Sequence, residues 1–334
     1  MTIIGYHASH EQVHPAALLR AVQRAEQAGF DAAMCSDHLA PWSARQGHSG
    51  FAWSWLGAAL AMTSLRMGVV NAPGQRYHPA IVAQATATLA AMFPGRFWVA
   101  LGSGENANEH VTGDAWPVKD LRDDRLVECV DVIRRLLAGQ EVTHHGLVTV
   151  DRARVWTLPE EPPALVAPAV TAATAARGAT WADGLITINQ PDDVLRELLD
   201  AYASAGGRGP RAVQVHVSWA PDQAEAERIA WDQWRSNVFP PPVCWDLATP
   251  EHFDVAATHV RPEDVARSVV ISADLGRHAD YLAHLADLGF DEIYVHHVGQ
   301  EQDAFVDAFA EHVLPQVRGG TTTPAGADGR GADG

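Results

Sequence analysis

Two side chains of this sequence are suited to proton transfer and follow predicted strands, which is where proteins of alternating strands and helices place their catalytic residues. His38 follows an apolar stretch at 31–36, and Glu105 follows the apolar run 98–101 and two glycines. An imidazole titrates at about pH 6.5, and burial can raise the pKa of a carboxyl group toward that value. A histidine and a glutamate that face one cavity can therefore exchange protons at neutral pH, so we assign His38 and Glu105 as candidate catalytic residues.

The surroundings of this pair fit a flat ligand. Trp42 lies in the loop after His38, and we assign it as the third candidate catalytic residue, while the two glycines before Glu105 leave room for a ring to approach the backbone. A structural interpretation stays open beside this one. In it, Asp37 and His38 cap their loop, and Glu105 caps the helix that follows it.

The other histidines and the cysteines give weaker signals. His144 and His145 lie in a predicted hairpin that faces solvent, and only one of His296 and His297 can point into a cavity because side chains alternate along a strand. The three cysteines are far apart, and the ligand spacing of a metal site is missing. The sequence therefore predicts no metal ligands and no disulfide framework.

Alternating strands and helices place these residues at strand ends. Short apolar or period-two runs predict strands, and a 3.6-residue apolar period predicts helices. We expect strands at 2–8, 31–36, 65–70, 97–101, 164–167, 184–188, 211–219 and 291–298. We expect helices at 14–29, 51–63, 78–92, 121–138, 171–182, 192–205, 222–235, 277–289 and 302–317.

Eight such units predict an α/β fold, a (β/α)8 TIM barrel with insertions. The insertions are a β-hairpin at 141–155 and a loop-rich excursion at 237–273 that covers the site end. The main alternative, an open doubly wound sheet, would carry an early GxGxxG turn, which does not follow the first strand. We predict a single domain at 1–318 and a disordered tail at 319–334.

Composition narrows the partners. The 334 residues include 41 acidic and 24 basic side chains, a formal net charge of −17, and no basic stripe interrupts this excess. Nucleic acid and anionic membranes are therefore not expected as partners. The start of the chain does not read as a signal peptide, and no apolar run is long enough to cross a bilayer, so we expect a cytoplasmic protein.

Several motifs carry a family resemblance in order along most of the chain. They are GYHASHEQ at 5–12, SDH at 36–38 with PW at 41–42, GH at 47–48, RYHP at 76–79 with AQA at 83–85, GSGE at 102–105 with NE at 108–109, Gly113 with AWP at 115–117, and ADG at 182–184. The chain in these motifs resembles the bacterial luciferase-like flavin-dependent oxidoreductases, in the branch typified by the deazaflavin-dependent glucose-6-phosphate dehydrogenase.

The resemblance implies a barrel with a flavin-type ring in its mouth. It implies that His38, Trp42 and Glu105 surround the reactive carbon of the ring, and that a non-prolyl cis peptide lies near Val70 and Asn71. It also implies a set of cofactor-binding residues, namely Asp37, Val70, Asn71, Gly104, Asn108, Ala169, Val170 and Thr171.

Departures from that branch bear on the ligands. The loop expected to hold the cofactor phosphate is glycine-rich in the branch but reads APAVT at 167–171 in this chain, where Pro168 removes one N–H donor. Ile188, Pro191 and Cys244 stand where the branch has a threonine and two lysines, so glucose 6-phosphate would be poorly held. The opening GYHASHEQ resembles a small subgroup regarded as having returned to an ordinary flavin. FMN is therefore the first expectation, and the deazaflavin coenzyme F420 is the alternative.

Three functional hypotheses follow. The first is a flavin-dependent oxidoreductase, monooxygenase or dehydrogenase, acting on an unknown small organic substrate, in which the protein orients the cofactor and supplies charge. The second is a non-catalytic flavin-binding barrel, and the third is a metal-dependent barrel hydrolase, which the missing ligand spacing disfavours. The resemblance also implies a possible homodimer.

Overall fold

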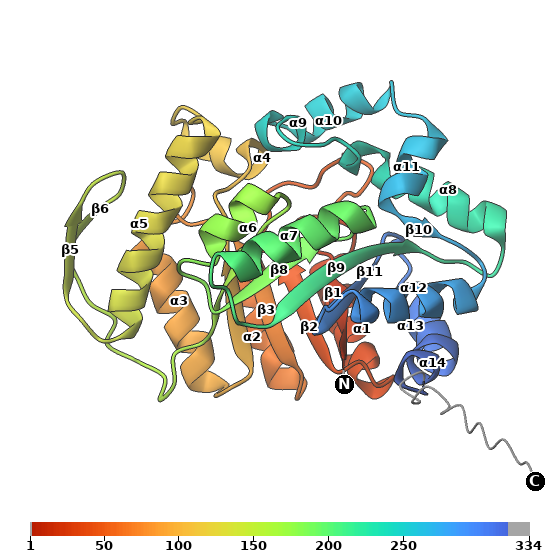
Figure 1. Ribbon diagram of the computed structural model, residues 1–334, viewed down its shortest axis with the longest axis horizontal. Coiled ribbons are helices and arrows are strands. Elements are labelled where there is room, and N and C mark those ends of the chain that lie inside the picture. Colours follow the sequence, from red (N-terminus) through yellow and green to blue (C-terminus); the bar gives the residue numbers. More distant parts are fainter. Residues whose placement is uncertain (1, 320–334) are drawn as a thin grey trace, which may run out of the picture.

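The computed structural model describes residues 2–319 and forms a closed barrel of eight parallel strands (Figure 1). The strands follow one another around the barrel, and the first pairs with the last to close it. They are β1 (Ile3–Ala8), β2 (Ala32–Ser36), β3 (Arg66–Asn71), β4 (Phe97–Leu101), β7 (Leu165–Pro168), β8 (Gly184–Ile188), β9 (Arg211–Ser218) and β11 (Glu292–His297). The predicted (β/α)8 TIM barrel is confirmed.

Helices connect consecutive strands or follow the last one, and they cover the outside of the barrel. They are α1 (Pro15–Gln27), α2 (Ala52–Met62), α3 (Pro79–Met92), α5 (Lys119–Leu137), α6 (Ala172–Gly178), α7 (Asp192–Ser204), α8 (Gln223–Trp234), α12 (Leu275–Asp287), α13 (Asp303–Ala308) and α14 (Leu314–Gly319). Both α1 and α3 begin with a His-Pro pair, in which the imidazole of His14 or His78 accepts a hydrogen bond from the second helical N–H. Proline fits the first helical position because its missing N–H would have no partner there.

The segment after α8 differs from the loop-rich excursion predicted for 237–273. It holds three short helices and a strand, α9 (Val243–Asp246), α10 (Pro250–Ala257), α11 (Pro262–Ser268) and β10 (Val270–Ile271), and these helices lie together along the upper edge of Figure 1. Thr249 caps α10 by accepting from the N–H of His252, and Pro250 and Pro262 open their helices. Proline thus begins two helices in a segment that was predicted to be rich in loops.

Three further segments complete the chain. The hairpin predicted at 141–155 is present as β5 (Val142–His145) and β6 (Thr149–Ala153), beside α5 on the left of Figure 1. The short helix α4 (Asn106–Glu109) follows β4, and the predicted helix 302–317 contains a π-helical stretch, Phe309–Val313, between α13 and α14. The predicted tail lies outside the described residues except for Gly319, which ends α14. Among residues 2–319, every helix is too short or too polar to cross a membrane.

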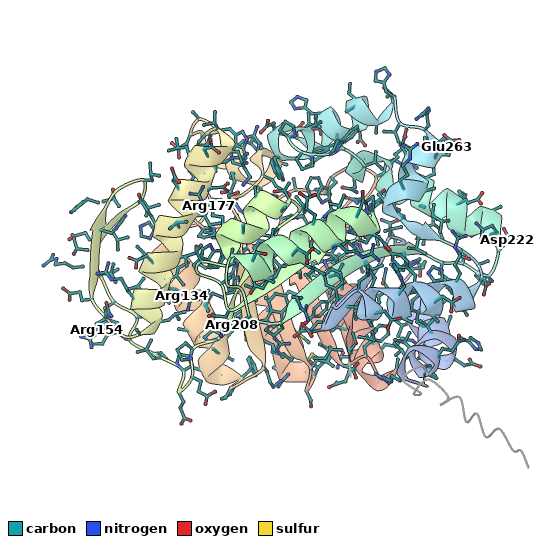
Figure 2. All side chains as sticks on the ribbon, viewed as in Figure 1. Arg134, Arg154, Arg177, Arg208, Asp222 and Glu263 are labelled. Carbon is teal, nitrogen blue, oxygen red and sulfur yellow. The ribbon has the colours of Figure 1, made fainter. Side chains whose placement is uncertain are left out.

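Side chains inside the barrel form a core separate from the larger core under the helices. This inner core consists only of strand residues: Ala32, Met34, Trp98, Ala100, Val166, Ile186, Ala212 and Tyr294. It fills the barrel, so a ligand can enter only at one end. The charged side chains that Figure 2 labels lie on the outer helices and loops.

One close approach limits the inner core. A Cβ atom on Gly68 would lie 1.9 Å from Cε2 of Trp98, its neighbour across the β3–β4 pair. We expect Gly68→Ala to lower the free energy of unfolding by about 1–3 kcal/mol, measured by urea denaturation, because the indole ring must move.

The matched control is Gly57→Ala in α2, where the new Cβ would meet nothing closer than Leu89 at 4.0 Å. This change should stabilise the protein by about 0.5–1 kcal/mol through helix propensity. Equal effects of the two substitutions would contradict the steric explanation.

Candidate active site

A cavity of about 800 Å3 opens at the carboxyl ends of the barrel strands. Its lining comes from nearly every strand end and from the segment that carries α9, α10 and α11. All three candidate catalytic residues line it, as do all the predicted cofactor-binding residues except Thr171. In a barrel this is the end at which active sites form.

His38 lies between two carboxylates. Its Nδ1 is 2.7 Å from Oε1 of Glu11, and its Nε2 is 3.8 Å from Oε2 of Glu105. Ser9 holds the other oxygen of Glu11 by donating its hydroxyl at 2.8 Å. The side chains of Glu11 and His38 are 5% and 17% exposed, whereas Glu105 is 27% exposed, so Glu105 is the member of this group most open to solvent.

The environment raises the proton affinity of both predicted catalytic groups. Burial opposes the charged form of His38, but Glu11 and then Glu105 outweigh it, so the pKa of His38 is raised. Burial raises the pKa of Glu105 against the opposing charge of His38. Burial also disfavours the charge of Glu11, yet His38 and the other nearby histidines lower its pKa to about 2. Glu11 is therefore a fixed anion that orients the imidazole, while His38 and Glu105 both bind a proton more tightly than they would in water.

Trp42 fixes the other side of the imidazole. Its ring meets His38 edge to face at a centroid distance of 5.2 Å, and it meets Phe253 of α10 in the same way at 5.1 Å. Such contacts define the orientation of the rings. Trp42 therefore joins the candidate catalytic histidine to the helices that follow α8.

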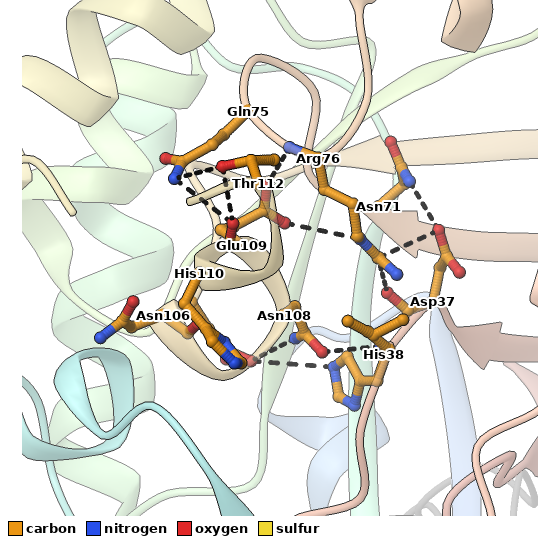
Figure 3. Close-up of polar contacts among 12 residues, drawn as sticks. Asp37, His38, Asn71, Gln75, Arg76, Asn106, Asn108, Glu109, His110 and Thr112 are labelled. Carbon is orange, nitrogen blue, oxygen red and sulfur yellow. Dashed lines mark hydrogen bonds and ion pairs between the residues drawn. The ribbon is translucent and has the colours of Figure 1, made fainter. Parts of the chain in front are cut away.

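An arginine whose side chain is only 10% exposed organises the neighbouring carboxylates. Arg76 lies between Asp37 and Glu109 in Figure 3. Its guanidinium donates to the carbonyl of Asp37 at 2.6 Å and lies 3.4 Å from that residue's carboxylate. Its backbone N–H donates to the carboxylate of Glu109 at 2.6 Å. The amide of Asn71 donates to Oδ2 of Asp37 at 2.8 Å. Asp37 and Glu109 are buried, and a buried charge requires such partners.

The strand-end residues fit the polar parts of a flavin-type group. Oδ1 of Asp37, Oδ1 of Asn71 and both ring nitrogens of His7 are buried without a hydrogen-bond partner among residues 2–319, and all three residues line the cavity. Gly104 has a φ of +85°, and a Cβ there would approach Cγ of Glu109 at 3.1 Å. Asn108 accepts from the N–H of Leu39 at 2.8 Å, which ties this loop to the one after β2.

The predicted phosphate loop is only partly suited to its role. Val170 and Ala169 line the cavity, but the N–H of Ala169 donates to the carbonyl of Ile186 at 2.9 Å and so continues the sheet. Thr171 does not reach the cavity, and its hydroxyl instead accepts from the N–H of Thr174 as the cap of α6. The hydroxyl of Thr171 is therefore used to start the helix, and the role of this residue beside the ligand stays a prediction.

The expectation of a non-prolyl cis peptide near Val70 and Asn71 is wrong. Among residues 2–319 the cis peptide is Pro241–Pro242, and the bond between Val70 and Asn71 is trans. Both residues continue β3 in regular register with β4, where Val70 pairs with Ala100 and Asn71 with Leu101. The regular ladder explains the trans geometry, since extended strand pairing uses trans peptides.

The outer part of the cavity is apolar and offers little positive charge. Ile188, Pro191 and Cys244 line it as their positions suggested, together with Val238, Phe239, Pro240, Pro241, Trp245 and Phe253. In the described part of the chain the lining holds one lysine and one arginine, and both form ion pairs, Lys119 with Asp123 and Arg267 with Asp264. A phosphorylated substrate would therefore have to break an existing ion pair.

Sequence reasoning missed three parts of this site. Glu11 lies in a loop three residues after β1, and its position beyond the first strand end was the available signal. Arg76 was noted only within a motif, because a sequence does not reveal that the side chain of a loop arginine is largely covered by the protein. The third part is a layer of three histidines, His7, His216 and His296, of which only His296 was considered from the sequence. The side chain of His296 lines the cavity, while that of His297 stacks on Phe305.

The chain matches known proteins along almost its whole length. A family model described as luciferase-like monooxygenase matches residues 3–292. An F420-dependent glucose-6-phosphate dehydrogenase from Nakamurella multipartita is 34% identical, with 94% of this chain and 96% of that protein covered. An F420-dependent hydroxymycolic acid dehydrogenase from Mycobacterium tuberculosis is 32% identical, with 94% and 88% covered.

Solved structures give the same picture. An F420-dependent secondary alcohol dehydrogenase in complex with an F420-acetone adduct aligns with a TM-score of 0.88 and 29% identity, covering 95% of this chain and 99% of that one. An F420-dependent tetrahydromethanopterin reductase from Methanopyrus kandleri aligns with a TM-score of 0.74 and 20% identity, over 95% and 99% of the two chains. The similarity to the second structure supports the fold only.

The contact between Glu11 and His38 generates a test of the site electrostatics. Glu11→Gln removes the charge that raises the pKa of His38, so that pKa should fall, as measured by NMR titration of the imidazole. Because the pKa of folded His38 is raised and that of Glu11 is lowered, the stability that the pair contributes is fully present between about pH 4.5 and pH 6.5. The stability advantage of wild type over Glu11→Gln should therefore shrink as the pH rises through the folded pKa of His38.

The control for this titration is Glu128→Gln, which removes a carboxylate that contacts His144 on the outer hairpin at 2.8 Å. It should leave the pKa of His38 unchanged. An unchanged His38 pKa in Glu11→Gln would show that Glu11 does not control it.

Proposed function

The chain belongs to the luciferase-like monooxygenase family, and on that premise we propose that it is a dehydrogenase that uses the deazaflavin F420 and acts on a small uncharged alcohol or carbonyl compound. The observation that carries the proposal is the position of His38 between Glu11 and Glu105 in the cavity. Alcohol oxidation requires a group that accepts the hydroxyl proton, and an imidazole flanked by carboxylates is suited to this.

The choice of cofactor rests on the relatives. FMN was the first expectation from the opening segment, but the relatives that match nearly the full length at 30–34% identity are named as F420-dependent enzymes. The structure with 29% identity and a TM-score of 0.88 is named in the same way. These matches support the deazaflavin over FMN, and FMN stays as the second candidate because of the segment at 5–12.

The roles of the protein residues follow from their geometry. The cofactor, when bound, supplies a ring carbon that accepts or donates hydride. Glu11 keeps the proton of the imidazole on Nδ1, so Nε2 of neutral His38 can accept the substrate hydroxyl proton. The imidazolium that forms is stabilised by both carboxylates, as the raised pKa of His38 indicates. Glu105, more exposed and with a raised pKa, can then pass a proton between the cavity and solvent.

The lining supports an uncharged substrate. The apolar residues contributed by the segment after α8 would pack against hydrocarbon, and both basic side chains of the lining have carboxylate partners. Carboxylates also line the cavity at Glu11, Asp37, Glu105 and Glu109, and they repel an anionic substrate. This favours a neutral alcohol over a sugar phosphate.

Direct binding separates the two cofactors. Fluorescence titration of the purified protein should give a dissociation constant for F420 at least about tenfold below that for FMN, an advantage of about 1.4 kcal/mol. Tighter binding of FMN would reverse the cofactor assignment and leave a flavin-dependent oxidoreductase. Binding of neither would overturn the proposed function.

Substitutions test the catalytic roles. With F420 bound and 2-propanol or cyclohexanol as substrate, His38→Ala and Glu105→Gln should each lower kcat/KM by about 10²- to 10⁴-fold. The rate is measured as the loss of the visible absorbance of the deazaflavin. Cofactor affinity should change much less, because neither change removes the ring pocket. His145→Ala on the exposed hairpin is the control and should retain wild-type activity. Full activity in His38→Ala would refute its role.

A further inference from the structure

A layer of neutral imidazoles forms the floor of the cavity above the inner core. His7, His216 and His296 come from the neighbouring strands β1, β9 and β11, and all three are buried and line the cavity. His7 stacks on His296 at a centroid distance of 4.3 Å. Burial lowers the pKa of His7 to about 4 and that of His216 to about 3, so this layer carries no charge at neutral pH. In the described part of the chain no group of three or more potential ligands is placed to hold a metal ion.

Hydrogen bonds fix the direction of every donor around His296. Gln12 donates its amide N–H to the carbonyl of Val298, so its oxygen Oε1 faces Nε2 of His296 at 2.6 Å, and that nitrogen must carry the proton. Nδ1 of His296 then accepts from Nε2 of Gln214 at 3.2 Å.

Gln214 has its donors committed. Its Nε2 is also 3.1 Å from Nε2 of His216, so its two N–H groups both point at imidazole nitrogens. The amide oxygen of Gln214 is left as an acceptor, and Gln214 lines the cavity. The hydrogen bonds around Gln214 therefore leave a hydrogen-bond acceptor at this point of the cavity floor.

His7 supplies the complementary polarity. It is 2% exposed, and neither of its ring nitrogens has a hydrogen-bond partner among residues 2–319. A neutral imidazole carries one N–H donor and one lone pair, and leaving them buried without partners is costly. The floor thus offers a donor from His7 and an acceptor from Gln214, both held by contacts with the same residue, His296.

We propose that His7 and Gln214 form a recognition site for the imide edge of a flavin-type ring, with the imidazole N–H donating to a ring carbonyl and the amide oxygen accepting from the ring N–H. An imide edge carries a carbonyl beside an N–H, which matches this donor and acceptor. FMN and F420 both carry that edge. The inference rests on the proposed function only in requiring a ring of this type, and it is independent of which of the two cofactors binds.

Lumiflavin and 3-methyllumiflavin are the probes, because they carry the ring alone and differ at the imide nitrogen. Binding is measured by quenching of flavin fluorescence. Wild-type protein should bind lumiflavin about tenfold more tightly than the N-methyl compound, the effect of one hydrogen bond with a buried partner.

The two floor residues should give different signatures. Gln214→Leu removes the acceptor for the ring N–H and should bring the affinity ratio of the two probes close to one. His7→Leu removes the donor to a carbonyl that both probes carry, so it should weaken both by about five- to tenfold and keep the ratio. His7→Asn, which retains a donor, should recover part of the loss.

His10→Leu is the matched control. His10 is also a buried histidine near β1, but its ring packs edge to face on Trp55 and does not line the cavity. It should leave both affinities unchanged, and circular dichroism with thermal melting checks that each variant folds.

Three results would overturn the inference: no binding of lumiflavin by wild type, equal affinity of wild type for the two probes, or an unchanged ratio in Gln214→Leu. The last would mean that the methyl group clashes sterically, since leucine is about as large as glutamine. If F420 fails to bind while the lumiflavin pattern holds, the proposed function is wrong and the recognition site of His7 and Gln214 stands. If F420 binds and the lumiflavin pattern is absent, the recognition site is wrong and the proposed function stands.

Discussion

Pairing of the first strand with the last is the contact on which the barrel and its site depend. Ile3 pairs with Glu292 and Tyr6 with Val295, and this register closes the sheet. Arg66 of β3 adds an ion pair to Glu292 at 2.7 Å. Without closure, His7 and Gln12 at one end of the chain would not meet His296 at the other. The contacts of highest sequence separation therefore build both the barrel and the cavity floor, and they require most of the chain to be in place before they form.

The site concentrates buried charge and unpaired polar groups that a purely structural core would avoid. Asp37 and Glu109 are held by a single arginine, and Glu11 is held by His38 and Ser9. Burying such groups costs free energy even when they are paired. When one partner is removed, the other stays buried as an unpaired charge, and its desolvation is no longer offset. Their presence at the strand ends, with apolar residues below them, is the pattern expected of a region selected for chemistry and not for stability.

Much of the fold could be predicted because each strand and helix carries its own local pattern. Runs such as 97–101 and 184–188 are apolar over the length of a strand, and the structure gives β4 and β8 the same bounds. The segment at 237–273 could not be read in this way, because a proline both ends one element and begins another, and only the capping contact of Thr249 decides between them. Of the site, strand-end residues such as His38 and Glu105 could be identified by position. Arg76 and Gln214 could not, since their importance lies in burial and in the direction of their hydrogen bonds, which tertiary contacts determine.

Aromatic rings in the cavity wall give the protein an optical property. Trp42, Trp234 and Trp245 line the cavity, and Trp42 also contacts both His38 and α10 through Phe253. Indole emits in the near-ultraviolet, where flavins and deazaflavins absorb, and resonance energy transfer is efficient over the few ångströms that separate residues of one cavity wall from its occupant. The occupant and the arrangement of the helices above it are therefore reported by the intrinsic fluorescence of the chain, without any added label.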